Sequence, residues 1–298
     1  MQSRETEEKR QHSTTTVPYS FYECRIPEAF QNVAIHWHRE FEINYIVSGK
    51  GEFLCGDEKL MASEGDILVL PPDMLHGASA CTGCQLVYYA FVFSPVLLGE
   101  NSNDRCTVEC IRPLIDGSLR IKLPISMDKQ EYEQLVSSIR AINLLVAKNL
   151  SKADLLLKSE LLRFFWILES GSGLTEKRKN QGKSYGDRVR PAFEYMQEHM
   201  EEEITVAQLA TAIHLSKSYF MSSFKKAAGI GAMEYLGQIR INKACTQLSE
   251  TNEKIAAIAV SCGYGNLSNF NRQFRKYTGC TPCGYRKQSN LVYEHDYK

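Results

Sequence analysis

Side chains that can recognise DNA bases recur along one side of a short segment near the end of the chain. They are Ser268, Asn271, Arg272, Arg275 and Lys276. The other side would carry the apolar residues Leu267, Phe270 and Phe274, so the spacing predicts a helix with one buried and one open face. Guanidinium and amide groups can each form two hydrogen bonds with a base edge in the major groove. The pattern therefore indicates a helix that binds duplex DNA.

Another helix is expected directly before this one. Ile255, Ile258 and Ala259 would form its apolar face, Gly263 can take the positive φ that ends it, and Asn266 can cap the next helix. A helix, a glycine turn and a polar second helix make up a helix-turn-helix unit.

A similar pattern lies about fifty residues upstream. Thr205 and Gln208 have the capping-box spacing, and Ser216 is placed to cap the following helix. The apolar faces would contain Ile204, Leu209, Ala210, Ile213, Phe220 and Phe224. The open face would carry Lys217, Ser218, Met221, Ser222, Lys225 and Lys226. Between the units, Leu236, Ile239, Ala244 and Leu248 predict one connecting helix, which would hold the two reading helices about 34 Å apart.

Residues 189–290 resemble the DNA-binding domain of AraC/XylS-type transcriptional regulators. The first half of the resemblance rests on Leu209, Ala210, Leu215, Ser216, Tyr219, Phe220, Phe224, Lys225 and Gly229. The second half rests on Ile255, Ile258, Ala259, Gly263, Tyr264, Ser268, Phe270, Phe274, Lys276, Gly279, Thr281, Pro282, Tyr285 and Arg286.

The resemblance implies which residues contact DNA. Base contacts are expected from Ser218, Met221, Ser222, Ser268, Asn269 and Arg272. Phosphate contacts are expected from Lys217, Lys225, Lys226, Asn271, Arg275 and Lys276, with Arg286 as a further candidate after the last turn. The three residues of the first unit, Ser218, Met221 and Ser222, cannot form bidentate pairs with a base. The second unit should therefore contribute more base specificity.

Charge is divided unevenly along a chain whose formal net charge is zero. Residues 172–298 hold 18 Lys and Arg against 12 Asp and Glu, whereas the first 171 residues hold 17 against 23. This division suits a DNA-binding domain joined to a domain that does not touch DNA. A length of 298 residues with 43% apolar residues allows about two domains, each with its own core.

Several observations bear on the compartment. The start, residues 1–16, is polar and charged, and we expect it to be a disordered arm, with a tail at 291–298. No run approaches ~20 apolar residues. Ten cysteines without a signal peptide indicate reduced thiols in a cytoplasm. Cys81–Cys84 and Cys280–Cys283 have CxxC spacing, but both pairs fall at predicted turns, so we favour no zinc or redox role for them.

The N-terminal half has a different pattern. From residue 33 to 93, short apolar runs alternate with Gly and Pro turns, which predicts a β-barrel or sandwich. His36, His38, Glu42 and Gly49 resemble the first motif of the cupin barrel, and Gly65, Pro71 and His76 resemble the second, with Asp73 where the family usually has glycine. Sensor domains of AraC-type regulators are small barrels of this kind. The resemblance implies an effector pocket formed by His36, Trp37, His38, Glu42, Tyr45 and His76.

The chemistry of this pocket has alternative interpretations. His36, His38, Glu42 and His76 are the types and spacings with which metal-binding cupins hold a divalent ion, and a metal-dependent enzyme would follow from that. The metal-free alternative, which we favour, pairs Glu42 with a protonated histidine and leaves the other groups to bind an effector, for which a sugar would suit. We therefore predict no cofactor and no catalytic residue. In another alternative, the barrel serves dimerisation alone.

Residues 127–171 have helical periodicity. The apolar positions are Tyr132, Leu135, Val136, Ile139, Ile142 and Leu145, then Leu155, Leu156, Leu161, Leu162, Phe165 and Leu168. Two such helices form an antiparallel hairpin, and their apolar excess favours a homodimer interface over packing within the chain, as in AraC-type sensors. Residues 172–188 are rich in Gly, Ser and charge and predict a flexible linker.

The sequence thus predicts a two-domain α+β protein. A cupin-like barrel (17–126) with a helical hairpin (127–171) would be linked to an all-α domain (189–290) of two helix-turn-helix units and a linker helix. The expected function is that of a bacterial, sequence-specific DNA-binding transcription regulator, which is not an enzyme and is controlled by a small molecule. The alternative is a metal-dependent cupin enzyme with an appended DNA-binding module.

Overall fold

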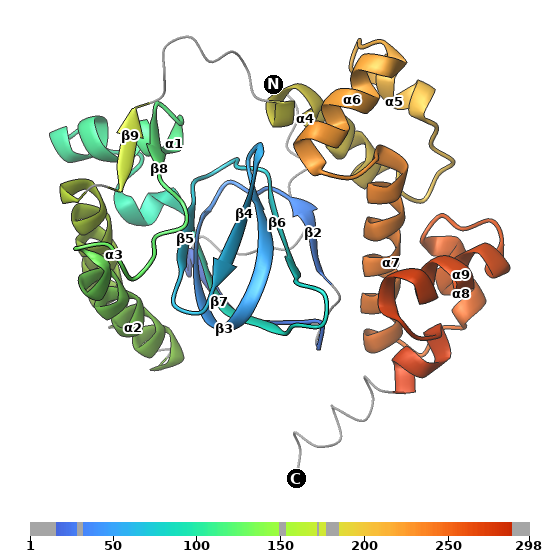
Figure 1. The fold of residues 1–298 in the computed structure, drawn as a ribbon, viewed down its shortest axis with the longest axis horizontal. Coiled ribbons are helices and arrows are strands. Elements are labelled where there is room, and N and C mark those ends of the chain that lie inside the picture. Colours follow the sequence, from blue (N-terminus) through green and yellow to red (C-terminus); the bar gives the residue numbers. More distant parts are fainter. Residues whose placement is uncertain (1–15, 29–31, 149–152, 172, 177–184, 288–298) are drawn as a thin grey trace. The chain divides into compact units, whose positions relative to one another are not determined.

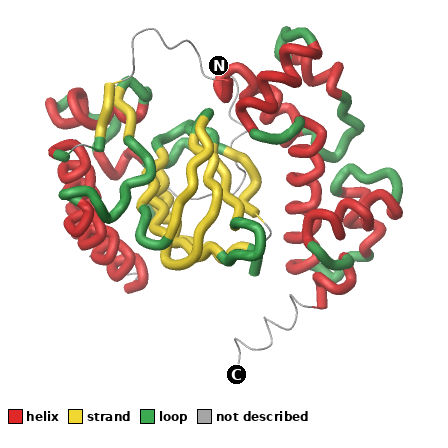
Figure 2. Tube along the Cα trace, viewed as in Figure 1, coloured by secondary structure: helices red, strands yellow, loops and turns green. Residues whose placement is uncertain are grey.

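The computed structural model describes residues 16–28, 32–148, 153–171, 173–176 and 185–287 (Figure 1). The expected tail and almost all of the expected arm lie outside these ranges. By its contacts the chain divides into two compact units, one made mostly of residues before Lys183 and the other mostly of residues from Lys183 on. Strands dominate the first unit and helices the second (Figure 2).

A seven-stranded sheet forms the body of the N-terminal unit. The strands are β1 (Tyr19–Ile26), β2 (Asn32–His36), β3 (Phe41–Cys55), β4 (Glu58–Ser63), β5 (Ile67–Leu70), β6 (His76–Ala80) and β7 (Leu86–Phe93). Their order is β1-β7-β3-β6-β2, with β4 and β5 also paired to β3. The first part of β3 pairs with β5 and β7 and the last part with β4 and β6, so this one long strand joins the two halves of the barrel.

Alternation along β3 decides what each of its residues faces. Phe41 and Ile43 belong to the large apolar core, in which strand residues meet the helices that cover the sheet. Glu42 and Asn44 lie between them in sequence and are also buried, so they point to the opposite side, into the barrel.

The helices of this unit pack against one side of the barrel. After the 3₁₀ turn η1 (Pro95–Leu98), the π-helix η2 (Thr107–Ile111), α1 (Arg112–Ile115) and β8 (Leu119–Ile121) come α2 (Tyr132–Lys148) and α3 (Ala153–Ser170). The predicted helical hairpin is therefore confirmed. Its buried side includes Leu135, Ile139, Leu161 and Phe165, which belong to the same apolar core as the sheet residues. The ring of Phe165 packs on those of Phe41 and Phe93.

The predicted linker over residues 172–188 was wrong at both of its ends. Leu174–Glu176 form β9, which pairs antiparallel with β8, and α4 begins at Tyr185. A three-residue strand is too short to show a hydrophobic period in the sequence. Its formation depends on pairing with β8, which a local pattern does not contain. Residues 177–184, between these elements, lie outside the described residues.

The C-terminal unit is a chain of helices. They are α4 (Tyr185–Glu198), α5 (Val206–Ala212), α6 (Lys217–Ala228), α7 (Ala232–Glu250), α8 (Ile255–Ser261) and α9 (Leu267–Thr278), and residues 282–287 are also helical. One core brings Phe193 of α4 against Phe224 of α6 and Tyr235 of α7. A second core contains Ile241 and Leu248 of α7 with Phe270 and Phe274 of α9. The two helix-turn-helix units and the connecting helix α7 follow the prediction.

Candidate DNA interface and sensor pocket

The reading helix of the first unit, α6, is held at both ends by local hydrogen bonds. Ser216 Oγ accepts from the Tyr219 amide at 3.3 Å, and Gly229 ends the helix with φ 71°. The capping box predicted upstream is also present, because Thr205 and Gln208 bond to each other's backbone amides. With Phe220 and Phe224 fully buried, the polar side faces solvent. Every residue predicted to contact DNA from this helix is exposed: Lys217, Ser218, Met221, Ser222, Lys225 and Lys226.

The reading helix of the second unit, α9, begins at a stronger cap. Asn266 Oδ1 accepts from the amides of Ser268 at 2.8 Å and Asn269 at 3.2 Å. Phe270 and Phe274 are fully buried, and the predicted contact residues are exposed: Ser268, Asn269, Asn271, Arg272, Arg275 and Lys276. Arg272 Nη2 donates to Asn269 Oδ1 at 3.0 Å, so two of the predicted base-contacting groups are already oriented together.

The turn between α8 and α9 requires glycine. Gly263 has φ 78°, and a Cβ at this position would lie 2.3 Å from the carbonyl oxygen of Met200. That close approach holds the turn against the loop before α5, beside Arg240, whose Nε donates to the same carbonyl at 2.6 Å. The expectation from sequence is confirmed here, with a packing reason added to the conformational one.

Leu267 corrects the sequence prediction. It was expected on the buried side of α9, but 45% of it is exposed. As the first residue of the helix it lies directly after the cap, where the turn leads away from the core formed with α7 and α8. It lines a groove of about 780 Å³ beside α9. The other lining residues are Ile255, Asn271, Arg272, Arg275, Lys276, Thr281, Pro282 and Cys283.

The basic residues near the reading helices differ in their surroundings. Lys226 Nζ lies 3.2 Å from the Tyr185 hydroxyl and over its ring, and Lys276 Nζ lies 3.7 Å from Glu234. Arg286 is engaged differently, because its Nη2 donates to the carbonyl of Glu253 at 2.7 Å and its Nε to that of Leu248 at 3.4 Å. Phosphate contact by Arg286 is therefore the wrong interpretation, since its guanidinium holds the loop between α7 and α8.

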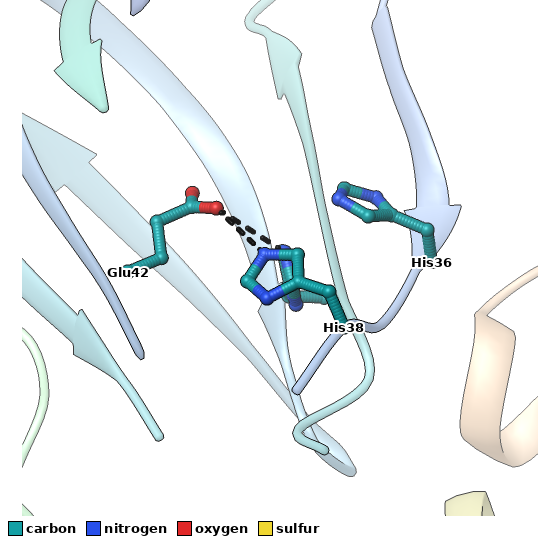
Figure 3. A group of neighbouring side chains, drawn as sticks. His36, His38 and Glu42 are labelled. Atoms are coloured by element: carbon teal, nitrogen blue, oxygen red, sulfur yellow. Dashed lines mark hydrogen bonds and ion pairs between the residues drawn. The ribbon is translucent and has the colours of Figure 1, made fainter. Parts of the chain in front are cut away.

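In the N-terminal unit, four polar side chains from three strands and the segment after β2 converge inside the barrel. His36 ends β2, His38 follows two residues later, Glu42 lies in β3 and His76 begins β6. One potential ligand atom from each lies within 4.8 Å of those of the others. His38, Glu42 and His76 are buried, and His36 is half-buried. In Figure 3 the His38 ring and the Glu42 carboxylate point toward each other, with the ring of His36 beside them.

The Glu42 carboxylate is the centre of this cluster. Its Oε2 lies 3.1 Å from His38 Nε2 and 3.5 Å from His76 Nε2, and its Oε1 accepts from Asn44 Nδ2 at 2.7 Å. Burial alone would raise the pKa of Glu42, but electrostatic interactions and hydrogen bonding with His76 and His38 outweigh it and hold that pKa well below its usual value. The carboxylate is therefore ionised. Asn44 was missed from sequence, although its position two residues after Glu42 puts it on the same side of the strand.

The loop before His76 contains Asp73, the residue at which this chain departs from the second cupin motif. Asp73, which stands where cupins usually have glycine, has φ 63°, the left-handed conformation that glycine adopts most easily. Its amide donates to the carbonyl of His38 at 2.8 Å. This bond ties the loop that precedes β6 to the segment after β2 and so positions His76 beside His38.

Trp37 and Tyr45 were also predicted to line the pocket, and Tyr45 lies elsewhere. Trp37 is buried, with 4% of its surface exposed. Tyr45 packs with Ile43 against the helix-facing core and lies with Tyr89, Ile139 and Asn143 around a small gap between sheet and helices. Because Tyr45 is three residues from Glu42 on one strand, it points to the opposite side of the sheet. Its assignment to the barrel pocket was therefore wrong.

Comparison with known families agrees with both units. The model of the AraC-like ligand binding domain matches residues 21–165, and that of a helix-turn-helix domain matches residues 209–288. The chain belongs to the AraC/XylS family of transcriptional regulators. It is a DNA-binding transcription regulator with an N-terminal effector-binding domain, and the alternative of a cupin enzyme is not favoured.

Relatives extend over most of the chain. The uncharacterized HTH-type transcriptional regulator YdeC of Bacillus subtilis is 22% identical over 286 residues, which cover 95% of this chain and 96% of YdeC. The melibiose operon regulatory protein of Escherichia coli is 24% identical over 85% of this chain and 83% of its own length. A solved structure of ToxT from Vibrio cholerae is 12% identical and aligns with a TM-score of 0.46 over 90% of this chain and 98% of ToxT. Among the described residues, no helix is both long and apolar enough to span a bilayer.

Proposed function

We propose that this regulator reads DNA with the exposed faces of α6 and α9, and that α9 provides most of the base specificity. The proposal rests on the cap of α9 by Asn266 and on the residues that this cap leaves exposed. Asn266 fixes the start of α9, and Asn269 and Arg272, each able to form bidentate pairs with a base, are both exposed on its first two turns. On α6 the residues assigned to base contacts are Ser218, Met221 and Ser222, which offer no such fork.

The phosphate contacts would come from the remaining polar residues of the same faces. We assign them to Lys217, Lys225, Lys226, Asn271, Arg275 and Lys276, of which Lys226 and Lys276 would have to exchange their present partners for phosphate. A positive C-terminal unit, in a bacterial cytoplasm where DNA is accessible, is consistent with this role.

The test is a selection of bound sequences from a random duplex library by the full chain, followed by binding measurements on the selected site. Two half-sites, of which one is strongly constrained in sequence and the other weakly, are expected if α9 dominates the readout. A selected site in which both halves are equally constrained, or no enrichment at all, would contradict the proposal.

We infer, second, that the protein is a homodimer formed through α3. Leu155, Leu162 and Trp166 are exposed and recur at i, i+7 and i+11, which places them on one stripe of the helix opposite the buried Leu157 and Phe164. An apolar stripe of this kind is unfavourable in water and indicates a partner surface. Exposed Leu156 on the same helix and Leu144 on α2 add to it.

Sedimentation analysis can test the dimer directly. Trp166→Glu should shift the protein from dimer to monomer without changing its secondary structure in circular dichroism, because 62% of the side chain is exposed. Met61→Glu, at another exposed apolar position on β4, is the matched control and should remain dimeric. A wild-type protein that is monomeric at micromolar concentration would rule the interface out.

The effector of the barrel is proposed to be a small polar molecule, with a sugar as the first candidate. The polar groups inside the barrel suit hydroxyl groups, and a relative is named for the melibiose operon. We retain His36, Trp37, His38, Glu42 and His76 as the residues that surround it. A thermal-shift screen of sugars on the full chain should find a ligand that also changes DNA affinity. His38→Ala should abolish that change and leave DNA binding without ligand intact.

A further inference from the structure

We propose that the barrel binds one divalent first-row transition metal ion through His36, His38, Glu42 and His76. The proposal goes beyond the regulator function, and it would survive if the assigned DNA contacts were wrong. It rests on how the four side chains are held, which the sequence did not reveal.

Backbone carbonyls determine which ring nitrogens can act as ligands. His76 Nδ1 lies 2.7 Å from the carbonyl oxygen of Met74, and His38 Nδ1 lies 3.2 Å from that of Glu40. A carbonyl oxygen accepts hydrogen bonds and cannot donate them, so both Nδ1 atoms carry the proton. In the neutral rings, Nε2 is therefore a lone-pair donor in both histidines, and both Nε2 atoms face the same carboxylate oxygen of Glu42.

Three lone-pair donors that face one another need a cation between them. A proton on His38 Nε2 would satisfy the 3.1 Å contact with Glu42, but it would leave His76 Nε2, which is buried and makes no hydrogen bond within the described residues. A buried nitrogen without a partner is costly. A single metal ion would satisfy His38, His76 and Glu42 together, and the half-buried ring of His36, centred 4.2 Å from that of His76, can supply the fourth ligand.

The dimensions and the supporting groups also fit a metal. Ligands about 2.0–2.1 Å from a tetrahedral ion are separated from one another by about 3.3 Å, and the two distances to Glu42 Oε2 are 3.1 Å and 3.5 Å. Metal-binding histidines usually donate their other ring N–H to a carbonyl, and metal-binding carboxylates accept a further hydrogen bond. Met74, Glu40 and Asn44 provide these bonds here.

The donor set indicates the class of metal. Three imidazoles and one carboxylate suit Zn²⁺, Fe²⁺, Ni²⁺ or Cu²⁺ better than Mg²⁺ or Ca²⁺, which prefer oxygen ligands. An effector that enters the barrel would then meet a metal ion rather than bare histidines.

The experiment uses the full, untagged chain after chelator treatment and dialysis. Titration with Zn²⁺, followed by elemental analysis of the desalted protein, should give one equivalent and a raised midpoint of thermal unfolding. Glu42→Gln and His76→Ala should lose this equivalent. His199→Ala, which removes an exposed histidine next to Glu202, is the matched control and should keep it. Asn44→Ala should weaken Zn²⁺ binding about 10- to 100-fold, because it removes the group that orients the carboxylate.

A spectroscopic measurement on the wild type covers the case in which a variant fails to fold. The electron paramagnetic resonance spectrum of the chain loaded with one equivalent of Cu²⁺ should show hyperfine coupling to several imidazole nitrogens. Less than a tenth of an equivalent of Zn²⁺ together with an unchanged unfolding midpoint would overturn the metal site and favour the protonated His38–Glu42 pair. Undiminished binding by folded Glu42→Gln and His76→Ala would overturn it as well, because the metal would then lie elsewhere.

Discussion

Arg272→Ala should reduce the base specificity of this regulator far more than Ser222→Ala. Arg272 is exposed on α9, and its Nη2 donates to Asn269 Oδ1 at 3.0 Å, so the two side chains lie together on the open side of the helix. A bidentate pair between arginine and guanine provides about 1–3 kcal/mol of discrimination. That energy corresponds to roughly 5- to 150-fold in the ratio of specific to random affinity. Ser222 has a single hydroxyl, so its removal should change the ratio by a few-fold at most.

Fluorescence anisotropy of the full chain on the selected site and on a scrambled duplex, at one fixed salt concentration, measures this ratio. Asn269→Ala should also reduce the ratio, because the Asn269 amide can form a bidentate pair with adenine. Arg120→Ala, which removes an exposed arginine from β8, controls for the loss of one positive charge and should leave the ratio unchanged. Equal losses from Arg272→Ala and Ser222→Ala would refute the asymmetry between the two reading helices.

Three further predictions concern single contacts. Arg275→Ala should weaken specific and random DNA binding alike and lower the slope of log affinity against log salt by about one unit, whereas an unchanged slope would place Arg275 away from phosphate. Arg286→Ala should instead destabilise the C-terminal unit by roughly 1–3 kcal/mol in denaturant unfolding, because a charged donor to two carbonyls is lost, and should leave the salt slope unchanged. Asp73→Gly should be tolerated because φ is 63° there, whereas Asp73→Val should lower the unfolding midpoint of the barrel, and equal midpoints for the two would exclude backbone strain at this site.

Both helix-turn-helix units could be predicted in detail because their determinants are local. Caps such as Ser216 and Asn266 act within three residues, and the buried phenylalanines repeat at helical spacing. Leu267 was the exception in α9. Its apolar character suggested burial, but the position of α9 against α7 and α8 leaves the first helical residue outside the core.

The barrel pocket could be predicted in part. Resemblance to the cupin motifs selected His36, His38, Glu42 and His76, and the structure brings these four together. It also selected Tyr45, which the alternation of β3 turns toward the helices. The sequence did not predict that Asn44, on the same side of β3 as Glu42, would donate to the Glu42 carboxylate. It also did not predict that the left-handed Asp73 would donate its amide to the carbonyl of His38.

The sequence by itself determined the two reading helices, their caps and the split into a strand-rich and a helical half. It could do so because each depends on residues a few positions apart, whose periodicity and hydrogen bonds act within one element. Tertiary structure alone decided that the Arg286 guanidinium donates to two backbone carbonyls. It also decided that His38 and His76, which are 38 residues apart, both direct Nε2 at one carboxylate oxygen of Glu42. Such contacts depend on strand pairing and on the packing of distant segments, and a local sequence pattern contains neither.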